Sequence, residues 1–168
     1  MNHAIQVSET GGPEVLKWME VDAPTPRAGE ALIRHTAVGL NFIDVYFRTG
    51  LYPAPTMPFI PGMEGAGEVW ARGDGVSNLS VGDRVAYAGP IGAYSEVRTL
   101  AADRLVKIPD SISDQTAAAM MLKGMTAQYL LRQTFKVEPG HTVLFHAAAG
   151  GVGLIAGQWA NALGATVI

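Results

Sequence analysis

Short apolar runs separated by glycine and proline fill the first two thirds of the chain. Up to about Pro109, apolar and polar residues alternate within each run, and turn-forming pairs such as Gly11-Gly12 and Gly82-Asp83 separate the runs. Alternation of this kind predicts β-strands joined by tight turns. The predicted strands cover residues 3–7, 16–21, 31–38, 65–70, 84–88, 93–100 and 105–108. Many short strands in succession favour an all-β barrel or a sandwich-like unit.

One segment departs from the β pattern. Between Asn41 and Thr49, apolar residues stand at positions 42, 43, 46 and 47, which is the spacing of one helical face. Gly50 follows directly, so we predict a short helix that ends there. Its carboxylate, Asp44, is expected to be solvated or structural.

The pattern becomes helical from Ser113 onward. Ala, Met and Leu are frequent in the segment 114–135, and Ser113 stands where a helix N-cap is expected. We expect Gly124 to divide this segment into two helices.

A strand, a turn, a helix and a second strand follow. Residues 142–147 predict a buried parallel strand because they are rich in β-branched and aromatic residues. A helix is predicted over 151–163, with Gly164 just beyond its end, and another strand over 165–168. This order is a βαβ unit, so the predicted fold class is mixed β and α/β.

Composition excludes several classes of protein. Of the 168 residues, 48% are apolar and 16% charged, which is enough apolar material for one domain or two small ones. The net charge of −3 comes without a basic block, so we expect no nucleic-acid partner. The absence of cysteine excludes disulfides, thiolate nucleophiles and zinc sites built on Cys. No signal peptide or membrane-spanning stretch is evident, so we expect a cytoplasmic protein without a membrane partner.

A glycine-rich turn is the strongest local motif. The sequence Ala148-Ala149-Gly150-Gly151-Val152-Gly153 is G-x-G-x-x-G with alanine at the first position. It follows a predicted strand and begins a predicted helix, where Gly150 would let the backbone approach a pyrophosphate and Gly153 would allow close packing. The alternative is a strand-to-helix turn without a ligand. The residue that distinguishes NAD from NADP stands about twenty positions further on, beyond residue 168.

The motifs, taken in order, resemble one family over essentially the whole chain. They lie at residues 11–16, 38–44 with Tyr46, 48–53, 61–67, 81–85, 92–94, 122–126 and 146–153. In this order they resemble the amino-terminal half of the zinc-independent medium-chain dehydrogenases/reductases of the quinone oxidoreductase (zeta-crystallin-like) group. The resemblance implies a GroES-like β-barrel catalytic domain over 1–120 and the beginning of a Rossmann domain over 121–168, with NADPH between them.

The same resemblance implies roles for individual residues. Those near the nicotinamide end would be Asn41, Phe42 and Tyr46. Those at the mouth of the Rossmann domain would be Lys123, Thr126 and Tyr129. The pyrophosphate loop would be Gly150, Gly151 and Val152.

No metal is expected. Where zinc-dependent relatives have Gly-His-Glu, this chain has Gly62-Met63-Glu64, and a thioether is a poor substitute for imidazole on zinc. The four histidines show no metal-site spacing, and we expect structural or surface roles for them. His146 is expected in a buried strand.

The catalytic candidates are Asn41, Tyr46 and Tyr52. A phenol could donate a hydrogen bond, or a proton, to an oxygen that gains charge when a conjugated carbonyl is reduced. The alternative is that both tyrosines fill space at the rim of the barrel.

Several functions stay open at this point. The resemblance favours NADPH-dependent reduction of a quinone or enone by a protein that is a homodimer when complete. A non-catalytic, crystallin-like NADPH-binding protein is the main alternative, and the lack of cysteine disfavours a zinc alcohol dehydrogenase. We also expect the 168-residue chain alone to be an inactive fragment that binds NADPH poorly and associates through its last strand.

Overall fold

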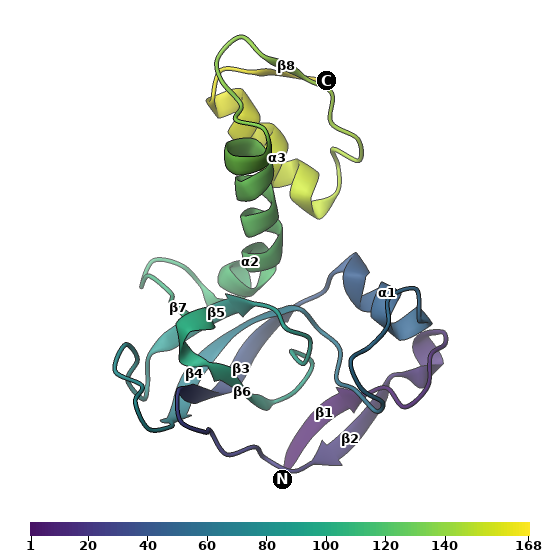
Figure 1. Ribbon diagram of the computed structural model, residues 1–168, viewed down its shortest axis with the longest axis vertical. Helices are drawn as coiled ribbons and strands as arrows, with labels where there is room; N and C mark the ends of the chain where they lie inside the picture. Colours follow the sequence, from purple (N-terminus) through teal and green to yellow (C-terminus); the bar gives the residue numbers. More distant parts are fainter. The chain divides into compact units, whose positions relative to one another are not determined.

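A five-stranded antiparallel sheet organises the first part of the computed structural model, which describes residues 1–168. The strands lie in the order β6-β3-β4-β5-β7 (Figure 1). They are β3 (Glu30–Gly39), β4 (Glu64–Arg72), β5 (Arg84–Ala88), β6 (Val97–Ala101) and β7 (Val106–Lys107). A separate antiparallel hairpin pairs β1 (Asn2–Gln6) with β2 (Lys17–Val21). Single 3-10 turns lie at Pro13–Val15 (η1) and Ala102–Arg104 (η2). The predicted β-rich beginning of the chain is confirmed.

The core of this sheet follows from alternation along its strands. On β3, Ala31 and Ile33 are fully buried while their neighbours are partly or fully exposed. They pack with residues of β4, β5 and β6 in one apolar cluster that includes Val69, Tyr87 and Leu100. Side chains two positions apart point to the same face of a strand, so a period of two builds the core.

The strand predicted over 93–100 begins later than expected. Only Val97–Ala101 joins the sheet, as β6. The preceding residues make other backbone bonds: Tyr94 N–H donates to Pro61 O and Ser95 forms a single bridge with Ala4. This segment therefore connects the hairpin and the sheet instead of extending β6.

The helix α1 (Phe42–Thr49) has the predicted bounds. It ends at Gly50, whose φ of 80° lies in the left-handed region that glycine adopts at low cost. Its buried residue is Asp44, whose Oδ2 accepts the Asn41 backbone N–H, so the expectation of a solvated carboxylate is wrong.

The helix α2 (Asp114–Tyr129) runs through Gly124 without interruption, so the predicted division at this residue is wrong. One interior glycine weakens a helix by only about 1 kcal/mol relative to alanine, which packing can offset. A π-helical turn, η3 (Leu130–Thr134), continues from it. The predicted N-cap is confirmed, because Thr116 N–H donates to Ser113 Oγ at 3.1 Å.

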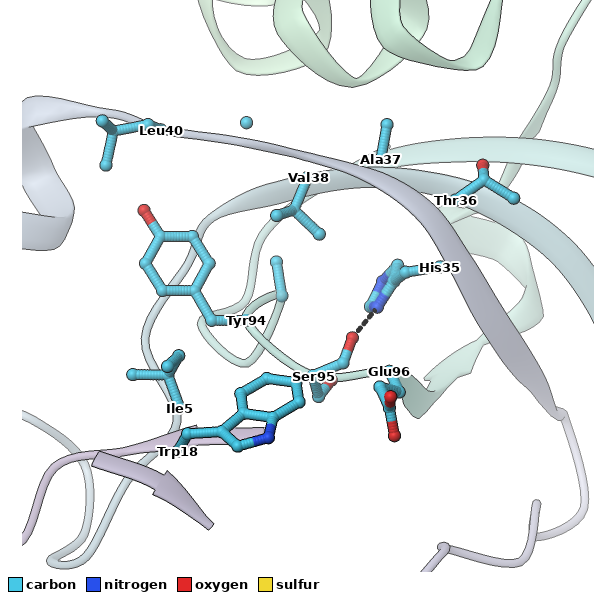
Figure 2. Close-up of a pocket in the computed structure, with 12 residues that line it drawn as sticks. Ile5, Trp18, His35, Thr36, Ala37, Val38, Leu40, Tyr94, Ser95 and Glu96 are labelled. Atoms are coloured by element: carbon cyan, nitrogen blue, oxygen red, sulfur yellow. Dashed lines mark hydrogen bonds between the residues drawn. The ribbon is translucent and has the colours of Figure 1, made fainter. Parts of the chain in front are cut away.

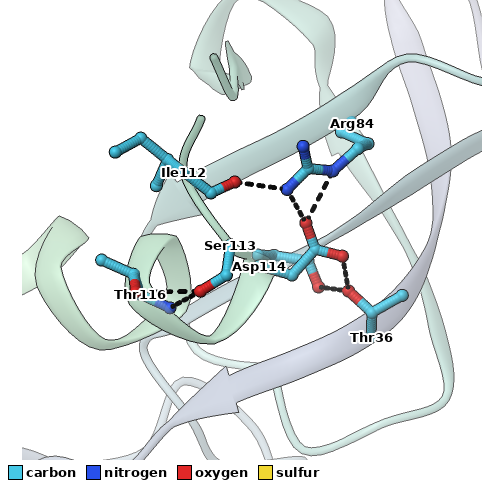
Figure 3. Close-up of polar contacts among 7 residues, drawn as sticks. Thr36, Arg84, Ile112, Ser113, Asp114 and Thr116 are labelled. Atoms are coloured by element: carbon cyan, nitrogen blue, oxygen red, sulfur yellow. Dashed lines mark hydrogen bonds and ion pairs between the residues drawn. The ribbon is translucent and has the colours of Figure 1, made fainter. Parts of the chain in front are cut away.

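An ion pair fixes the first turn of α2 to the sheet (Figure 3). Arg84 donates through Nε and Nη2 to Asp114 Oδ1 at 2.9 and 2.6 Å, and Thr36 Oγ1 donates to Asp114 Oδ2 at 2.6 Å. The Thr36 hydrogen bond, followed by Arg84, lowers the pKa of Asp114 below its ordinary value.

The chain divides into two compact units, Met1–Met121 and Leu122–Ile168. In the second, β8 (Thr142–Val143) and β9 (Thr166–Val167) form a parallel pair, and α3 (Gly151–Ala162) lies between them in sequence. Gly164 follows α3 with a φ of 85°, as expected for a residue just beyond a helix end.

The sequence predicted a buried strand over 142–147, and this prediction is wrong. The ladder ends at Val143, Leu144 is 68% exposed, and His146 lies exposed in a turn. A parallel strand is buried when neighbours and helices cover both of its sides, whereas β8 has a single neighbour, β9. The apolar core of this unit forms where Val143 and Phe145 pack with α3.

Candidate cofactor and substrate site

A buried polar cluster lies at the beginning of α1. Glu64 is fully buried, and Asp44 and Asn41 are only 4% and 9% exposed. The Asn41 backbone N–H donates to Asp44 Oδ2 at 2.9 Å, and its side-chain Nδ2 donates to Glu64 Oε1 at 2.8 Å. Asn41 therefore bonds to carboxylates from α1 and β4.

Tyr94 is the fourth residue of this cluster. Its hydroxyl donates to Asp44 Oδ2 at 2.8 Å. Burial, together with this hydrogen bond, raises the pKa of Tyr94 well above its ordinary value. The phenol therefore stays protonated and acts as a donor to Asp44.

An aromatic surface lies next to the polar cluster. Phe42, the first residue of α1, is 75% exposed, and its ring centroid lies 5.8 Å from that of Tyr46. The Tyr46 and Tyr52 centroids are 5.3 Å apart, because the chain turns back after Gly50 and Tyr52 N–H donates to Tyr46 O. The structure thus places Phe42, Tyr46 and Tyr52 together, directly after Asn41 in the chain, and their roles stay predictions.

The glycine-rich turn forms the N-terminus of α3. Gly150 is the N-cap residue, and no side chain caps the helix. An added Cβ at Gly150 would meet Ala147 O at 3.1 Å, a tight contact with the backbone that a small shift could relieve. At Gly153 an added Cβ would lie 2.5 Å from Ala148 O and 2.6 Å from Ala147 O. Gly153 therefore permits the close approach of the helix to the turn.

The three candidate residues of α2 stand three positions apart along the helix: Lys123, Thr126 and Tyr129. The side chain of Lys123 lies over the turn, since a Cβ on Gly151 would be 2.7 Å from Lys123 Cδ. Thr126 Oγ1 donates to Leu122 O at 2.7 Å, and Tyr129 is 46% exposed. Lys123 thus lies beside the glycine turn within the same unit.

These residues fit the pyrophosphate of a dinucleotide. The first backbone bond of α3 is Leu154 N–H to Gly150 O, so the N–H groups of the first turn have no acceptor within the helix. They carry the positive end of the helix dipole, and Lys123 adds a positive charge nearby. Ala147 has a φ of 56°, a left-handed conformation that is uncommon for alanine and is found in tight functional turns.

An apolar pocket of about 560 Å³ lies in the first unit and shares Tyr94 with the polar cluster (Figure 2). Trp18, Val38 and Tyr94 line it, and the His35 ring points at the carbonyl of Ser95. His35 Nδ1 is 2.6 Å from Ser95 O and Nε2 is 2.7 Å from the Tyr87 hydroxyl. Burial lowers the pKa of His35 to about 4, so the ring is neutral at pH 7. This histidine has a structural role.

Sequence analysis missed Glu64 and Tyr94 as members of the site and took Asp44 as a residue outside it. Glu64 directly follows Met63, the residue at the position of the zinc-ligand histidine in zinc-dependent relatives. A carboxylate that begins an apolar strand was the available signal. Across residues 1–168, no group of three His, Asp or Glu side chains is arranged to hold a metal ion, and the absence of a functional metal stays a prediction.

The comparison with known families supports this architecture. Residues 27–110, which are 84 of the 168 residues, match the alcohol dehydrogenase GroES-like domain. The chain belongs to the alcohol dehydrogenase GroES-like domain family. The predicted fold class is therefore confirmed for the first unit by both topology and family.

Relatives extend the similarity over the whole chain. A quinone oxidoreductase of Pseudomonas aeruginosa is 57% identical over 100% of this chain and 52% of its own length. A 2-haloacrylate reductase of a Burkholderia species is 46% identical over 98% of this chain and 51% of its own. The crystal structure of Escherichia coli quinone oxidoreductase complexed with NADPH is 49% identical, with a TM-score of 0.95 over 98% of this chain and 51% of that one.

These comparisons confirm the resemblance to quinone oxidoreductases that the ordered motifs predicted. The chain spans about half the length of the curated relatives it matches. No helix in it is both long enough and apolar enough to cross a membrane. The roles of the individual site residues stay predictions.

Proposed function

We propose that this GroES-like chain contributes to a metal-free oxidoreductase that transfers a hydride from NADPH to a quinone or an α,β-unsaturated carbonyl compound. The observation that carries the proposal is the open, uncapped helix N-terminus at Gly150–Val152 in a chain whose relatives are quinone oxidoreductases. When bound, NADPH would supply the hydride, while the protein binds and orients it.

The glycine turn is proposed to hold the pyrophosphate. Gly150, Gly151 and Val152 would offer backbone N–H groups, with Lys123 as a neighbouring charge. Thr126 and Tyr129 are proposed as further contacts from α2. The description of the Escherichia coli relative as an NADPH complex supports NADPH as the cofactor.

The beginning of α1 is proposed to take the nicotinamide end and the substrate. Phe42, Tyr46 and Tyr52 present aromatic rings that suit a planar quinone, since offset aromatic pairs contribute about 0.5–1.5 kcal/mol beyond burial. The Tyr46 and Tyr52 hydroxyls are donors for an oxygen that gains charge on reduction. Asn41 would orient the reacting groups.

An enone substrate has support from another relative. The Burkholderia protein is named a 2-haloacrylate reductase, and a haloacrylate carries a C=C bond conjugated to a carboxylate. A quinone contains the same conjugation of C=C with C=O. One site that stabilises charge on the carbonyl oxygen serves both classes.

Other features of the whole protein stay proposals. The compact units Met1–Met121 and Leu122–Ile168 support a catalytic domain over 1–120 followed by the beginning of a Rossmann domain. A homodimer and a cytoplasmic location stay predictions from sequence.

A chimera tests the activity. The part of the Pseudomonas aeruginosa quinone oxidoreductase that follows the aligned region would be joined after Ile168. NADPH oxidation would be followed with quinones and enones as acceptors, and reduction of NADP⁺ would be followed with simple alcohols as donors. We expect turnover with quinones or enones and none with alcohols. Alcohol oxidation alone would contradict the proposal.

The alternative of a non-catalytic NADPH-binding protein predicts a different result in the same assay. The folded chimera would bind NADPH but oxidise it with none of these acceptors. The relative's own enzyme, assayed in parallel, shows that the acceptors and conditions support turnover.

A further inference from the structure

Glu64 is a fully buried carboxylate at the beginning of β4. It pairs across the sheet with Gly39, and any side chain on Gly39 would collide with the Glu64 carboxylate. Glycine at this position therefore makes room for the buried acid. Removing a carboxylate from water is unfavourable by several kcal/mol unless polar groups bind it. A buried carboxylate at this position is therefore expected to form hydrogen bonds with a polar partner.

A polar group that the structure brings to this carboxylate is the side-chain amide of Asn41. Nδ2 donates to Glu64 Oε1 at 2.8 Å. An amide presents a donor on one side and an acceptor on the other, whereas a carboxylate only accepts. The two orientations of the Asn41 amide are therefore not equivalent, because only one of them makes this bond. We propose that Glu64 is a positioning residue that fixes the orientation of the Asn41 amide.

A second carboxylate holds the same residue by its backbone. Asp44 Oδ2 accepts the Asn41 N–H at 2.9 Å and the Tyr94 hydroxyl at 2.8 Å. Asn41 is thus fixed at its main chain through Asp44 and at its side chain through Glu64. With its backbone held, the remaining freedom of Asn41 is rotation of its side chain. The capping-box contact with the Asp44 backbone N–H and the bond to Glu64 together restrict that rotation.

This inference rests on the proposed function, in which the beginning of α1 faces the nicotinamide end and the substrate. With Nδ2 directed at Glu64, the amide oxygen lies on the side of the Asp44 backbone N–H, which it contacts in the capping box of α1. Glu64 therefore decides which atoms of Asn41 a ligand meets. A flipped amide would exchange donor and acceptor and lose the match to the ligand's polar groups.

The first test follows the Asn41 side-chain NH2 signals by nuclear magnetic resonance in the 15N-labelled 168-residue chain. In Glu64→Gln the residue at 64 can donate as well as accept, so both orientations of Asn41 become possible. We expect the Asn41 signals to move upfield as the charge-assisted bond is lost, and to broaden or double. Unchanged signals would overturn the proposal.

Glu68→Gln is the matched control. Glu68 lies on the same strand, but its carboxylate is partly exposed and accepts from Arg34 at 3.1 Å. This variant makes the same chemical change and should leave the Asn41 signals in place. If both variants move the signals equally, the effect comes from the charge of β4 and the proposal fails.

A reversed pair separates positioning from packing. Asn41→Asp alone places two carboxylates together and should lower the thermal midpoint strongly. Adding Glu64→Gln restores a hydrogen bond with donor and acceptor exchanged, so the double variant should regain most of the midpoint. We expect its binding of NADPH and 1,4-naphthoquinone to stay at least about tenfold weaker than that of the natural chain. Recovery of both stability and binding would show that only packing matters and would overturn the proposal. If Glu64→Gln alone does not fold, this double variant carries the test.

Failure of the proposed function gives a different result. If the chimera that carries the natural residues 1–168 binds neither NADPH nor naphthoquinone, the proposed function fails, and the comparison of Glu64→Gln with Glu68→Gln still decides whether the amide is fixed. If the chimera binds them and Glu64→Gln binds equally well with unchanged Asn41 signals, the positioning role fails while the proposed function stands.

Discussion

The turns that begin α1 and α3 hold their candidate ligand-binding groups in opposite ways. At α1, buried side chains from three segments meet: Asp44 from the helix, Glu64 from β4 and Tyr94 from the segment before β6. At α3, the binding groups are backbone N–H groups, and the residues matter because they lack side chains. One site depends on tertiary structure, whereas the other depends on local backbone geometry.

This difference decides how each site should respond to change. The site at α1 should be sensitive to charge and to substitutions far away in sequence. The site at α3 should be sensitive to added volume within the turn itself.

The largest expected effect is a pH-dependent loss of stability in the first unit. His35 bonds to the carbonyl of Ser95, next to Tyr94, and burial lowers its pKa from 6.5 to about 4. Between these values the unfolded chain binds a proton that the folded chain does not, so stability is full above pH 6.5 and falls as the pH drops toward 4. The loss attributable to His35 is up to about 3 kcal/mol.

Urea unfolding between pH 7 and pH 4 measures this loss. His35→Gln cannot titrate in this range and should show a smaller decrease in the free energy of unfolding over the same interval. An equal decrease in the variant and the natural chain would assign the acid sensitivity to other groups.

The next effect concerns added volume in the turn before α3. Gly153→Ala would bring Cβ within 2.6 Å of two backbone oxygens, which cannot move as a flexible side chain can. We expect a loss of about 2 kcal/mol in the second unit. Gly157→Ala is the control, since its Cβ would meet nothing within 4 Å and should add up to about 1 kcal/mol of helix stability. Hydrogen exchange of the α3 amides reports both, and equal protection in the two variants would contradict the close packing at Gly153.

A smaller effect should separate binding from folding in the same turn. A side chain at Gly150 meets only Ala147 O, at 3.1 Å, and its φ of −75° suits any residue. In the full-length chimera, Gly150→Val should fold but weaken NADPH binding at least about tenfold, or 1.4 kcal/mol. Calorimetric titration tests this, and an unchanged dissociation constant in the folded variant would reject the pyrophosphate assignment.

The smallest effect is expected at the ion pair that fixes α2. Asp114→Asn removes the charge that Arg84 and Thr36 contact and should lower stability by less than about 1 kcal/mol, because the pair is partly exposed. The pKa of Asp114 is lowered in the folded chain, so its contribution is present above the ordinary pKa of 3.8 and lost as the pH falls through the lower folded value. Urea unfolding should therefore show a gap between variant and natural chain at pH 7 that closes in acid. A gap that persists at low pH would contradict the role of the charge.

Local patterns predicted much of the fold. Alternation along β3, the helical spacing before Gly50 and the N-cap at Ser113 depend on neighbouring residues, and the structure confirms each. Gly124 was misjudged because a propensity of about 1 kcal/mol does not end a helix that packing supports. The strand at 142–147 was misjudged because burial depends on neighbours that a local pattern does not contain.

The same reasoning applies to the candidate site. The glycine turn was visible in sequence because its residues are contiguous. Resemblance to a family supplied Asn41, Phe42 and Tyr46, whereas Glu64 and Tyr94 stayed hidden. Glu64 lies 23 residues along the chain from its partner Asn41, and Tyr94 lies 50 residues from its partner Asp44. Only the folded chain brings these pairs together.

The most direct test is whether the turns that begin α1 and α3 bind the two proposed ligands. Nuclear magnetic resonance would follow a titration of the 15N- and 13C-labelled 168-residue chain with NADPH and, separately, with 1,4-naphthoquinone. We predict that NADPH shifts the backbone amides of residues 150–153, and that the quinone shifts the ring signals of Phe42, Tyr46 and Tyr52. Because the chain spans about half the length of its relatives, binding is expected to be weak, so the position of the shifts is the readout. Shifts at neither turn at millimolar ligand, or shifts of residues outside both turns, would contradict the account.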